Sequence, residues 1–217
     1  MQEYPYFTPQ VLSDDIFVLY GGQTGSSTPA QRQAAYLLSE EQMTEHLSSF
    51  LVPTIITGTA FWKGGSLFET QFGHVRSVLF VSAEEIRQIN PLETKIVTGS
   101  AMIRNPEYGY LDLMLPCPYG QVYRNTVVYE SGLATGTVTN PSMLNALTIA
   151  AQINLNDWVQ DLSNEGVADI GVQSFSNQSY SENRVKLGRN AFGSSAMAQR
   201  AARLVSKYRS KPGIGFR

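Results

Sequence analysis

The residues best suited to chemistry in this chain are one cysteine and two histidines. Cys117 stands between two prolines in Pro116-Cys-Pro-Tyr-Gly120, and His46 and His74 lie far from it and from each other along the chain. A cysteine nucleophile needs a base within hydrogen-bond reach, so the fold would have to bring a histidine to it. We expect the prolines to make this segment a rigid structural turn. A single cysteine predicts no internal disulfide, and two separated histidines predict no metal site.

Two further segments invite comparison with catalytic loops. Gly21-Gly-Gln-Thr-Gly-Ser-Ser27 is rich in glycine, but it lacks the lysine and the strand-to-helix context of a phosphate-binding loop. Gly171-Val-Gln-Ser-Phe-Ser176 departs from the Gly-x-Ser-x-Gly elbow of hydrolases. The sequence therefore predicts a protein that is not an enzyme and that binds no cofactor and no metal.

The composition favours a protein made for contact with other proteins. The chain has 217 residues, of which 42% are apolar and 16% charged, and the charged share is below the roughly 25% of an average soluble protein. No run approaches the roughly 18 apolar residues of a membrane span, and the first residues lack the pattern of a secretory signal. We expect a soluble chain, made in a cytoplasm, with no membrane contact.

Charge is distributed unevenly along the chain. Residues 184 to 217 contain no acidic residue and carry a charge of +9, whereas the remainder has seven basic and 18 acidic residues, or −11. The nine basic residues are Arg184, Lys186, Arg189, Arg200, Arg203, Lys207, Arg209, Lys211 and Arg217. Such polarity is typical of a nucleic-acid-binding arm, a tail that docks on an acidic partner, head-to-tail attraction between identical subunits, or simply a solvated helix and tail.

The first fifty residues predict a helix that begins at Thr28 and Pro29. A threonine hydroxyl can accept a free backbone amide at a helix start, and proline loses nothing at the first helical position. Ser39 with Gln42 has the form of a second capping box, which favours two short helices or one interrupted helix. The expected buried side of this segment consists of Ala34, Leu37, Leu38, His46, Leu47, Phe50 and Leu51.

The middle of the chain predicts short strands. Five β-like runs, separated by turn residues, cover 54–59, 74–82, 95–104, 108–115 and 121–129. Asn105-Pro-Glu-Tyr108 joins the third run to the fourth and favours an antiparallel hairpin. No helical pattern alternates with these runs, so the sequence predicts an α+β fold with a small antiparallel sheet rather than a parallel one.

Two helices follow. Asn140 and Pro141 form the start of a long helix with apolar residues at spacings of three and four. Ser194 or Ser195 is the expected start of a C-terminal helix whose face is formed by Met197, Ala201, Leu204, Val205 and Tyr208, with Arg200, Arg203 and Lys207 off that face. The glycines and proline after Lys211 predict an extended tail.

Several of these segments together resemble a known family. They are Thr126-Val-Val-Tyr-Glu-Ser-Gly132, the helix opened by Pro141, Glu165-Gly-Val-Ala-Asp-Ile-Gly171, Gln173-Ser-Phe-Ser176, Ser179-Tyr-Ser181 and Leu204-Val-Ser-Lys-Tyr-Arg209. This order resembles the head-tail connector proteins (adaptors, or head completion proteins) of long-tailed bacteriophages, mainly over residues 123–217. The stretch of about 53–120 departs from compact members, and we interpret it as an insertion.

The resemblance implies a fold and a role. The fold would be a small helical bundle of an N-terminal, a long central and a C-terminal helix, with residues 1–52 and 121–208 as the adaptor core. Residues 53–120 would be an inserted antiparallel β-rich subdomain, and 209–217 an extended C-terminal tail. The role would be that of a structural virion protein in a closed ring, a dodecamer by resemblance, that joins the portal vertex to the tail or to the next neck ring after assembly in the host cytoplasm.

The resemblance also implies roles for the basic C-terminal segment. The tail would dock on the portal through Lys207, Arg209, Lys211, Ile214, Phe216 and Arg217, with Phe216 as an anchor and backbone hydrogen bonds at an exposed strand edge. The residues Arg184, Lys186, Arg189, Arg200 and Arg203 would contact a neighbouring subunit or the packaged DNA in the ring lumen without sequence preference. Two alternatives stay open, another neck or tail-completion ring protein and a basic nucleic-acid-binding module.

Overall fold

A computed structural model describes residues 5–62, 67–85, 95–117, 122–164 and 195–209. The chain divides into two compact units. A helical unit lies within residues 1–46 and 136–208, and a β unit within 47–135 and 209–217. Each unit is treated by itself below.

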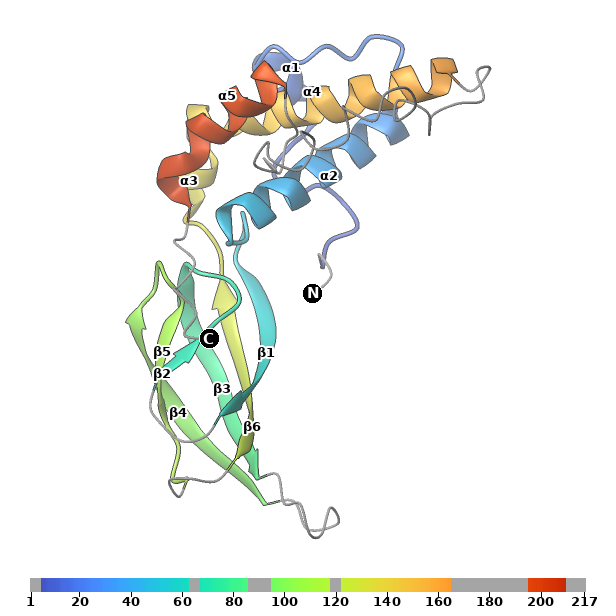
Figure 1. Cartoon of the computed structure of the whole chain (residues 1–217). Coiled ribbons are helices and arrows are strands. Elements are labelled where there is room, and N and C mark those ends of the chain that lie inside the picture. Colours follow the sequence, from blue (N-terminus) through green and yellow to red (C-terminus); the bar gives the residue numbers. More distant parts are fainter. Residues whose placement is uncertain (1–4, 63–66, 86–94, 118–121, 165–194, 210–217) are drawn as a thin grey trace, which may run out of the picture. The chain divides into compact units, whose positions relative to one another are not determined.

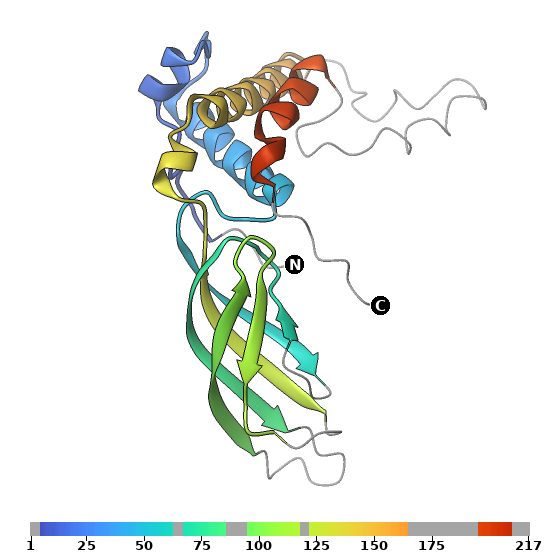
Figure 2. The same ribbon diagram turned by 90° about the vertical axis from the view of Figure 1, so that its left-hand side faces the viewer.

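The β unit is one antiparallel sheet of six strands in the order β1-β6-β3-β4-β5-β2 (Figure 1). The strands are β1 (Thr54–Trp62), β2 (Leu67–Glu69), β3 (Val75–Glu85), β4 (Ile96–Asn105), β5 (Tyr110–Met114) and β6 (Tyr123–Ser131). The sheet curves into an open half-barrel, and β1 and β2 are its two edge strands (Figure 2).

Alternation along β6 shows how the sheet acquires its two faces. Tyr123, Val127 and Tyr129 are buried on the inner face, whereas Arg124 between them points outward and is exposed. Val127 pairs with Gly58 of β1 on one side and with Val81 of β3 on the other, so the inner positions of three strands share one apolar core. The strand nearest to the long helix in sequence is therefore an interior strand of the sheet.

The predicted fold class is wrong. The sequence predicted a helical bundle carrying a small β-rich insertion, but the chain is organised around the six-stranded half-barrel. Along β6, every second residue from Tyr123 to Ser131 is buried, so one face of this strand lies in the core of the β unit. Among the described helices, α4 and α5 pack closely along each other, and Asn154 Nδ2 of α4 donates to Gln42 Oε1 of α2 at 3.2 Å. All five predicted strand runs are present, and β2 was missed because it has three residues.

The described residues of the helical unit form five α-helices and a short 3₁₀ turn. They are α1 (Asp14–Leu19), α2 (Pro29–Leu47), α3 (Thr135–Val138), α4 (Pro141–Asn164), α5 (Ala196–Val205) and the 3₁₀ helix η2 (Ser206–Tyr208). The predicted start of α2 is confirmed as a reciprocal capping box, because Gln31 N donates to Thr28 Oγ1 (3.3 Å) and Thr28 N donates to Gln31 Oε1 (2.7 Å).

The second helix start at Ser39 is wrong, since α2 runs without interruption. The Ser39 hydroxyl is buried and donates back to the Tyr36 carbonyl at 2.7 Å. The buried face of α2 is also different from the predicted one. It contains Ala35, Tyr36, Glu40, Met43 and Leu47, whereas Ala34 is exposed and Leu37 and Leu38 are half-buried.

Helices α4 and α5 begin where the sequence predicted. Asn140 Oδ1 accepts from Ser142 N at 3.0 Å, and Ser195 Oγ accepts from Ala198 N at 3.1 Å. Buried side chains of α4 include Met143, Leu147 and Leu155. No described helix is long and apolar enough to cross a membrane.

Candidate functional site

Cys117, His46 and His74, the residues best suited to chemistry in the sequence, all lie among the described residues. Burial, with a smaller contribution from Glu85, raises the pKa of the Cys117 thiol, and the nearby Lys95 opposes this shift. The raised pKa favours the protonated thiol, which is a poor nucleophile. Burial lowers the pKa of His74. Within the described residues no group of three or more His, Cys, Asp or Glu side chains could hold a metal ion.

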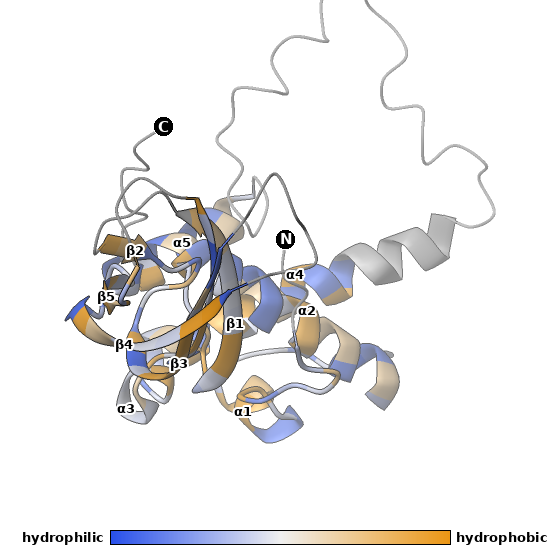
Figure 3. Cartoon of the chain, turned by 90° about the horizontal axis from the view of Figure 1, so that it is seen from below, coloured by the Kyte–Doolittle hydropathy of each residue, from blue (hydrophilic) through white to orange (hydrophobic). Residues whose placement is uncertain are grey.

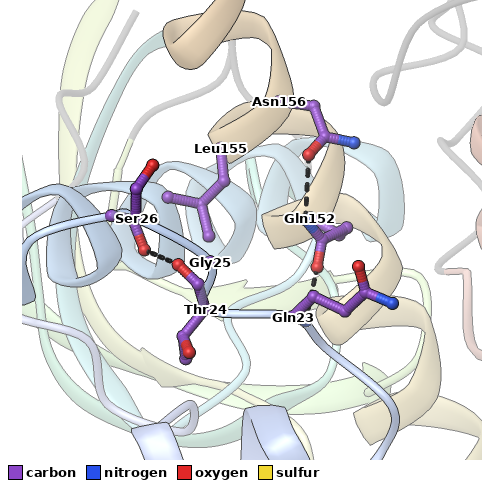
Figure 4. Close-up of a pocket in the computed structure, with 8 residues that line it drawn as sticks. Gln23, Thr24, Gly25, Ser26, Gln152, Leu155 and Asn156 are labelled. Atoms are coloured by element: carbon purple, nitrogen blue, oxygen red, sulfur yellow. Dashed lines mark hydrogen bonds between the residues drawn. The ribbon is translucent and has the colours of Figure 1, made fainter.

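The glycine-rich loop lines a pocket of about 260 Å³ beside α4 (Figure 4). Gln152 fixes the loop, because its Oε1 accepts from Gln23 N at 2.7 Å while its Nε2 donates to Asn156 Oδ1 at 2.9 Å. The lining residues are Gln23, Thr24, Gly25, Ser26, Ser27, Gln152, Leu155 and Asn156. All of them are uncharged, so the pocket offers no acid, base or anion-binding cation.

A basic stripe, defined as Arg200, Arg203 and Lys207, follows α5 and η2 on the side away from the buried Ala198, Ala201 and Val205. All three side chains are exposed, and none forms an ion pair with any other described residue. Lys207 Nζ lies 4.7 Å above the centre of the Tyr208 ring. The prediction that these cations lie off the buried face of the helix is confirmed.

An acidic stripe lies on α2 in the same helical unit. It consists of half-buried Glu41 and exposed Glu45, which continue a line of exposed Ala30, exposed Ala34 and half-buried Leu37 at spacings of three and four. Neither glutamate forms an ion pair with another described residue. The acidic and basic stripes thus present opposite, unneutralised charges on two helices of one unit.

The outer face of the sheet carries a row that crosses four strands. Phe61 of β1, Arg124 of β6, Glu84 of β3 and Ile96 of β4 are successive partners in the ladder. Arg124 Nη1 lies 3.9 Å from Glu84 Oε2, and its guanidinium carbon lies 5.8 Å from the centre of the Phe61 ring. Aromatic, cationic, anionic and aliphatic groups are thereby fixed side by side on an open surface.

Many large apolar side chains on this outer face are exposed, and Figure 3 shows both hydrophobic and hydrophilic residues on the strands. Phe61 is 71% exposed, Ile55 and Ile96 are each 65% exposed, and Met102 is 53% exposed. Exposed apolar groups gathered on one face of a sheet are typical of a contact surface.

Strand β1 adds an edge to this sheet, since it pairs with β6 on one side and with no described strand on the other. Its nine residues, Thr54–Trp62, contain no charged residue and no proline, and their register with β6 is unbroken. Natural proteins usually protect such an edge with charges, proline or bulges, because its free backbone groups can pair with another strand. The edge of β1 is therefore a second feature suited to assembly.

The predicted site residues fall into two groups. Arg200, Arg203, Lys207 and Arg209 are described, and all four are exposed. The others, Arg184, Lys186, Arg189, Lys211, Ile214, Phe216 and Arg217, lie outside the described residues. Sequence reasoning missed the outer face of the sheet. The signal was present, because Ile55 and Phe61 fall on one face of the strand while Ile56 falls on the other, so both faces carry large apolar residues.

No protein-family model and no curated protein matches the chain. A solved structure matches it in fold, namely a chain of the neck of an empty GTA particle (gene transfer agent, a phage-like particle), computed with C6 symmetry. The TM-score is 0.53 at 12% sequence identity, and the match covers 94% of this chain and 92% of the other. At this identity the likeness concerns the fold, and it spans both the helical and the β unit.

Proposed function

We propose that the chain is a structural neck protein of a phage-like particle. The observation that carries the proposal is the fold likeness to a neck chain over 94% of this chain, since a match of that extent includes the half-barrel as well as the helices. The sequence resemblance to head-tail connectors rests on other grounds, the segments between 123 and 217, and favours the same class of protein.

The proposed role is structural rather than catalytic. The described surface supports this role, because it exposes an apolar sheet face, an uncharged strand edge and two unneutralised charged stripes. When another protein covers surfaces of this kind, the free energy decreases. The one pocket described above is uncharged and small, and Cys117 is held as a protonated thiol.

The proposed assembly is a closed ring in the virion, formed in the host cytoplasm, that joins the portal vertex to the tail or to the next neck ring. A dodecamer is the ring order that we propose, and C6 symmetry in the neighbour's particle is compatible with it. A ring subunit presents two different surfaces to its two neighbours, which suits a chain with stripes of opposite charge.

The C-terminal end of the chain is the part that we propose to dock on the portal. Lys207 and Arg209 are exposed where the described chain ends, and Lys211, Ile214, Phe216 and Arg217 follow in sequence. The basic residues would speed and orient the encounter, and Phe216 would anchor it. The alternative proposal is that the chain forms a ring at another position of the neck, as another neck or tail-completion ring protein.

The experiment combines the full chain with purified portal complexes. Light scattering after size exclusion, followed by negative-stain imaging, should show rings stacked on the portal. A chain that stays monomeric and never binds the portal would refute the proposed function. Deletion of 210–217 should abolish docking, and a second variant, which replaces Lys211 and Arg217 with glutamine while keeping the length, separates the contribution of these two charges from that of the rest of the tail. Normal docking of the deletion variant would refute the role of the tail alone.

A further inference from the structure

We propose that the basic stripe of one subunit packs against the acidic stripe of the next, so that α5 and α2 form the contact between two copies of this chain in the ring. The inference rests on the proposed function, which supplies the ring, and it goes further by naming the two surfaces. It is carried by the placement of Arg200, Arg203 and Lys207 on α5 and of Glu41 and Glu45 on α2.

The charges of both stripes lack ion-pair partners among the described residues. The ion pairs described elsewhere involve other residues, such as Arg32 with Asp14 and Arg124 with Glu84. Within this part of the chain, three cations and two anions therefore carry no opposite charge beside them, and only Lys207 has an aromatic ring, that of Tyr208, below it. Opposite charges that remain unpaired on two helices of the same unit are what a head-to-tail contact between identical subunits requires.

Local helix stability does not explain the acidic stripe. Glu41 and Glu45 are like charges four residues apart, and Glu45 lies in the last turn of α2, where the helix dipole disfavours negative charge. On α5, Arg200 and Arg203 are like charges three residues apart on a helix without an acidic residue, although the helix dipole favours Arg203 in the last turn. An external partner of opposite charge would relieve the repulsion within each pair.

The two stripes also match in spacing and in the groups around the charges. Ala196, Arg200 and Arg203 on α5 and Lys207 on η2 follow at the same sequence intervals, four, three and four, as Ala30, Ala34, Leu37 and Glu41 on α2. The exposed alanines permit close approach of two helices. Met197, 47% exposed, flanks the basic stripe, and half-buried Leu37 belongs to the acidic line. Apolar groups beside the charges favour a protein partner over DNA.

The test exchanges the charges of the two stripes. One variant carries Arg200→Glu and Arg203→Glu, and the other carries Glu41→Lys and Glu45→Lys. Each variant alone would bring like charges together at every subunit contact, so we expect its half-assembly concentration to rise at least about tenfold over that of the unchanged chain. The matched control is Arg76→Glu, because Arg76 is an exposed arginine of the β unit without an ion pair among the described residues.

An equal mixture of the two variants gives the decisive result. Every α5 to α2 contact between unlike variants again joins opposite charges, so the mixture should form rings that alternate the two chains and contain equal numbers of each, as native mass spectrometry would show. Circular dichroism of each variant checks that the helices are intact. Assembly is followed in low and high salt, alone or on the portal.

Three outcomes separate the possible failures. If the unchanged chain forms no ring alone or on the portal, the proposed function fails. If the unchanged chain forms rings and both variants assemble equally well, or their mixture gives no rescue, the α5 to α2 contact is refuted. If Arg200→Glu with Arg203→Glu keeps the ring but loses binding to a short DNA duplex, the basic stripe faces DNA and the proposal is overturned.

Discussion

Arg32 of α2 and Asp14 of α1 form a bidentate ion pair. Arg32 Nε lies 2.9 Å from Asp14 Oδ1 and Arg32 Nη2 lies 2.7 Å from Asp14 Oδ2. Tyr36 donates its hydroxyl to Asp14 Oδ1 at 2.9 Å, and Arg32 Nη1 donates to the Ser27 carbonyl at 2.7 Å. The Asp14 carboxylate thus joins the short α1 to α2, and Arg32 of α2 also holds the loop that precedes α2 through the Ser27 carbonyl.

The first prediction concerns Asp14→Asn. The hydrogen bonds from Arg32 hold the pKa of Asp14 below its ordinary value, against the opposing effect of burial. The pair therefore stabilises the fold above the ordinary carboxyl pKa, and this stability is lost as the pH falls through the lowered pKa. Because Asp14 is half-exposed, we expect Asp14→Asn to cost at most about 1 kcal/mol at neutral pH.

Urea unfolding at several pH values measures this effect. The control is Asp15→Asn, which removes the neighbouring charge from the same first turn of α1 but has no ion pair among the described residues. The two variants should differ at neutral pH and converge in acid. An equal free energy of unfolding for both at neutral pH would contradict the role given to the pair.

The second prediction concerns Glu40, whose side chain is fully buried in α2. Its carboxylate accepts backbone hydrogen bonds of 2.8 Å each from Gln10, Val11 and Leu12. Glu40→Ala leaves these three N–H groups without their acceptor, and we expect a loss of about 2–4 kcal/mol. Glu40→Gln keeps one acceptor oxygen, so its loss should be smaller. Faster hydrogen exchange at residues 10–12 would report the release of this segment.

The pH dependence of Glu40→Gln follows from the same site. Burial raises the pKa of Glu40, although the three N–H donors oppose the shift. Stability from this group is therefore highest below the ordinary carboxyl pKa and decreases as the pH rises through the raised pKa. The penalty of Glu40→Gln should be largest in acid and should shrink toward neutral pH. A penalty that grows with pH would contradict this assignment.

Local features of the fold were predictable from the sequence, and the residues show why. Thr28, Asn140 and Ser195 cap their helices as predicted, because a cap depends on residues within three positions of it. The buried face of α2 was not predictable, because Glu40 is buried through a segment 28 to 30 residues away. A glutamate in a helix otherwise indicates a solvated position.

The arrangement of the sheet depends even more on distant partners. Strand β6 directly precedes the helices in sequence, which favoured grouping it with them, yet it pairs with residues of β1 and β3 that lie 38 to 77 residues away. The basic stripe was found because charge counting needs no fold. The acidic stripe was missed because Ala34 and Leu37 were expected to be buried, and only the observed face of α2 places Glu41 and Glu45 on the surface.

The third prediction concerns the turn between β4 and β5. Gly109 has φ +73°, and its carbonyl accepts from Thr70 N at 2.9 Å and from Thr70 Oγ1 at 3.0 Å. An added Cβ would overlap the Thr70 hydroxyl and lie 3.0 Å from the Phe72 carbonyl oxygen. We expect Gly109→Ala to cost about 2–3 kcal/mol in thermal unfolding. Gly136→Ala is the control, because no atom lies within 4 Å of its Cβ position.

The fourth prediction concerns the outer face of the sheet. Ile55 and Phe61 are 65% and 71% exposed, so replacing both with serine removes little buried area. We expect the free energy of unfolding to change by less than about 0.5 kcal/mol per substitution. If the face is a contact surface of the assembled particle, the double variant should lose occupancy in purified particles, because the apolar area that the contact covers is reduced.

Two control variants separate loss of a contact surface from loss of stability. Ile56→Ser changes the neighbouring position on the inner face, which is 1% exposed, and should destabilise the β unit strongly. Thr57→Ser and Thr59→Ser alter the same outer face without removing a large apolar group. Particles that retain the Ile55→Ser and Phe61→Ser variant at full occupancy, with unchanged stability of the free chain, would show that this face stays open to solvent in the particle and that contacts elsewhere hold the subunit.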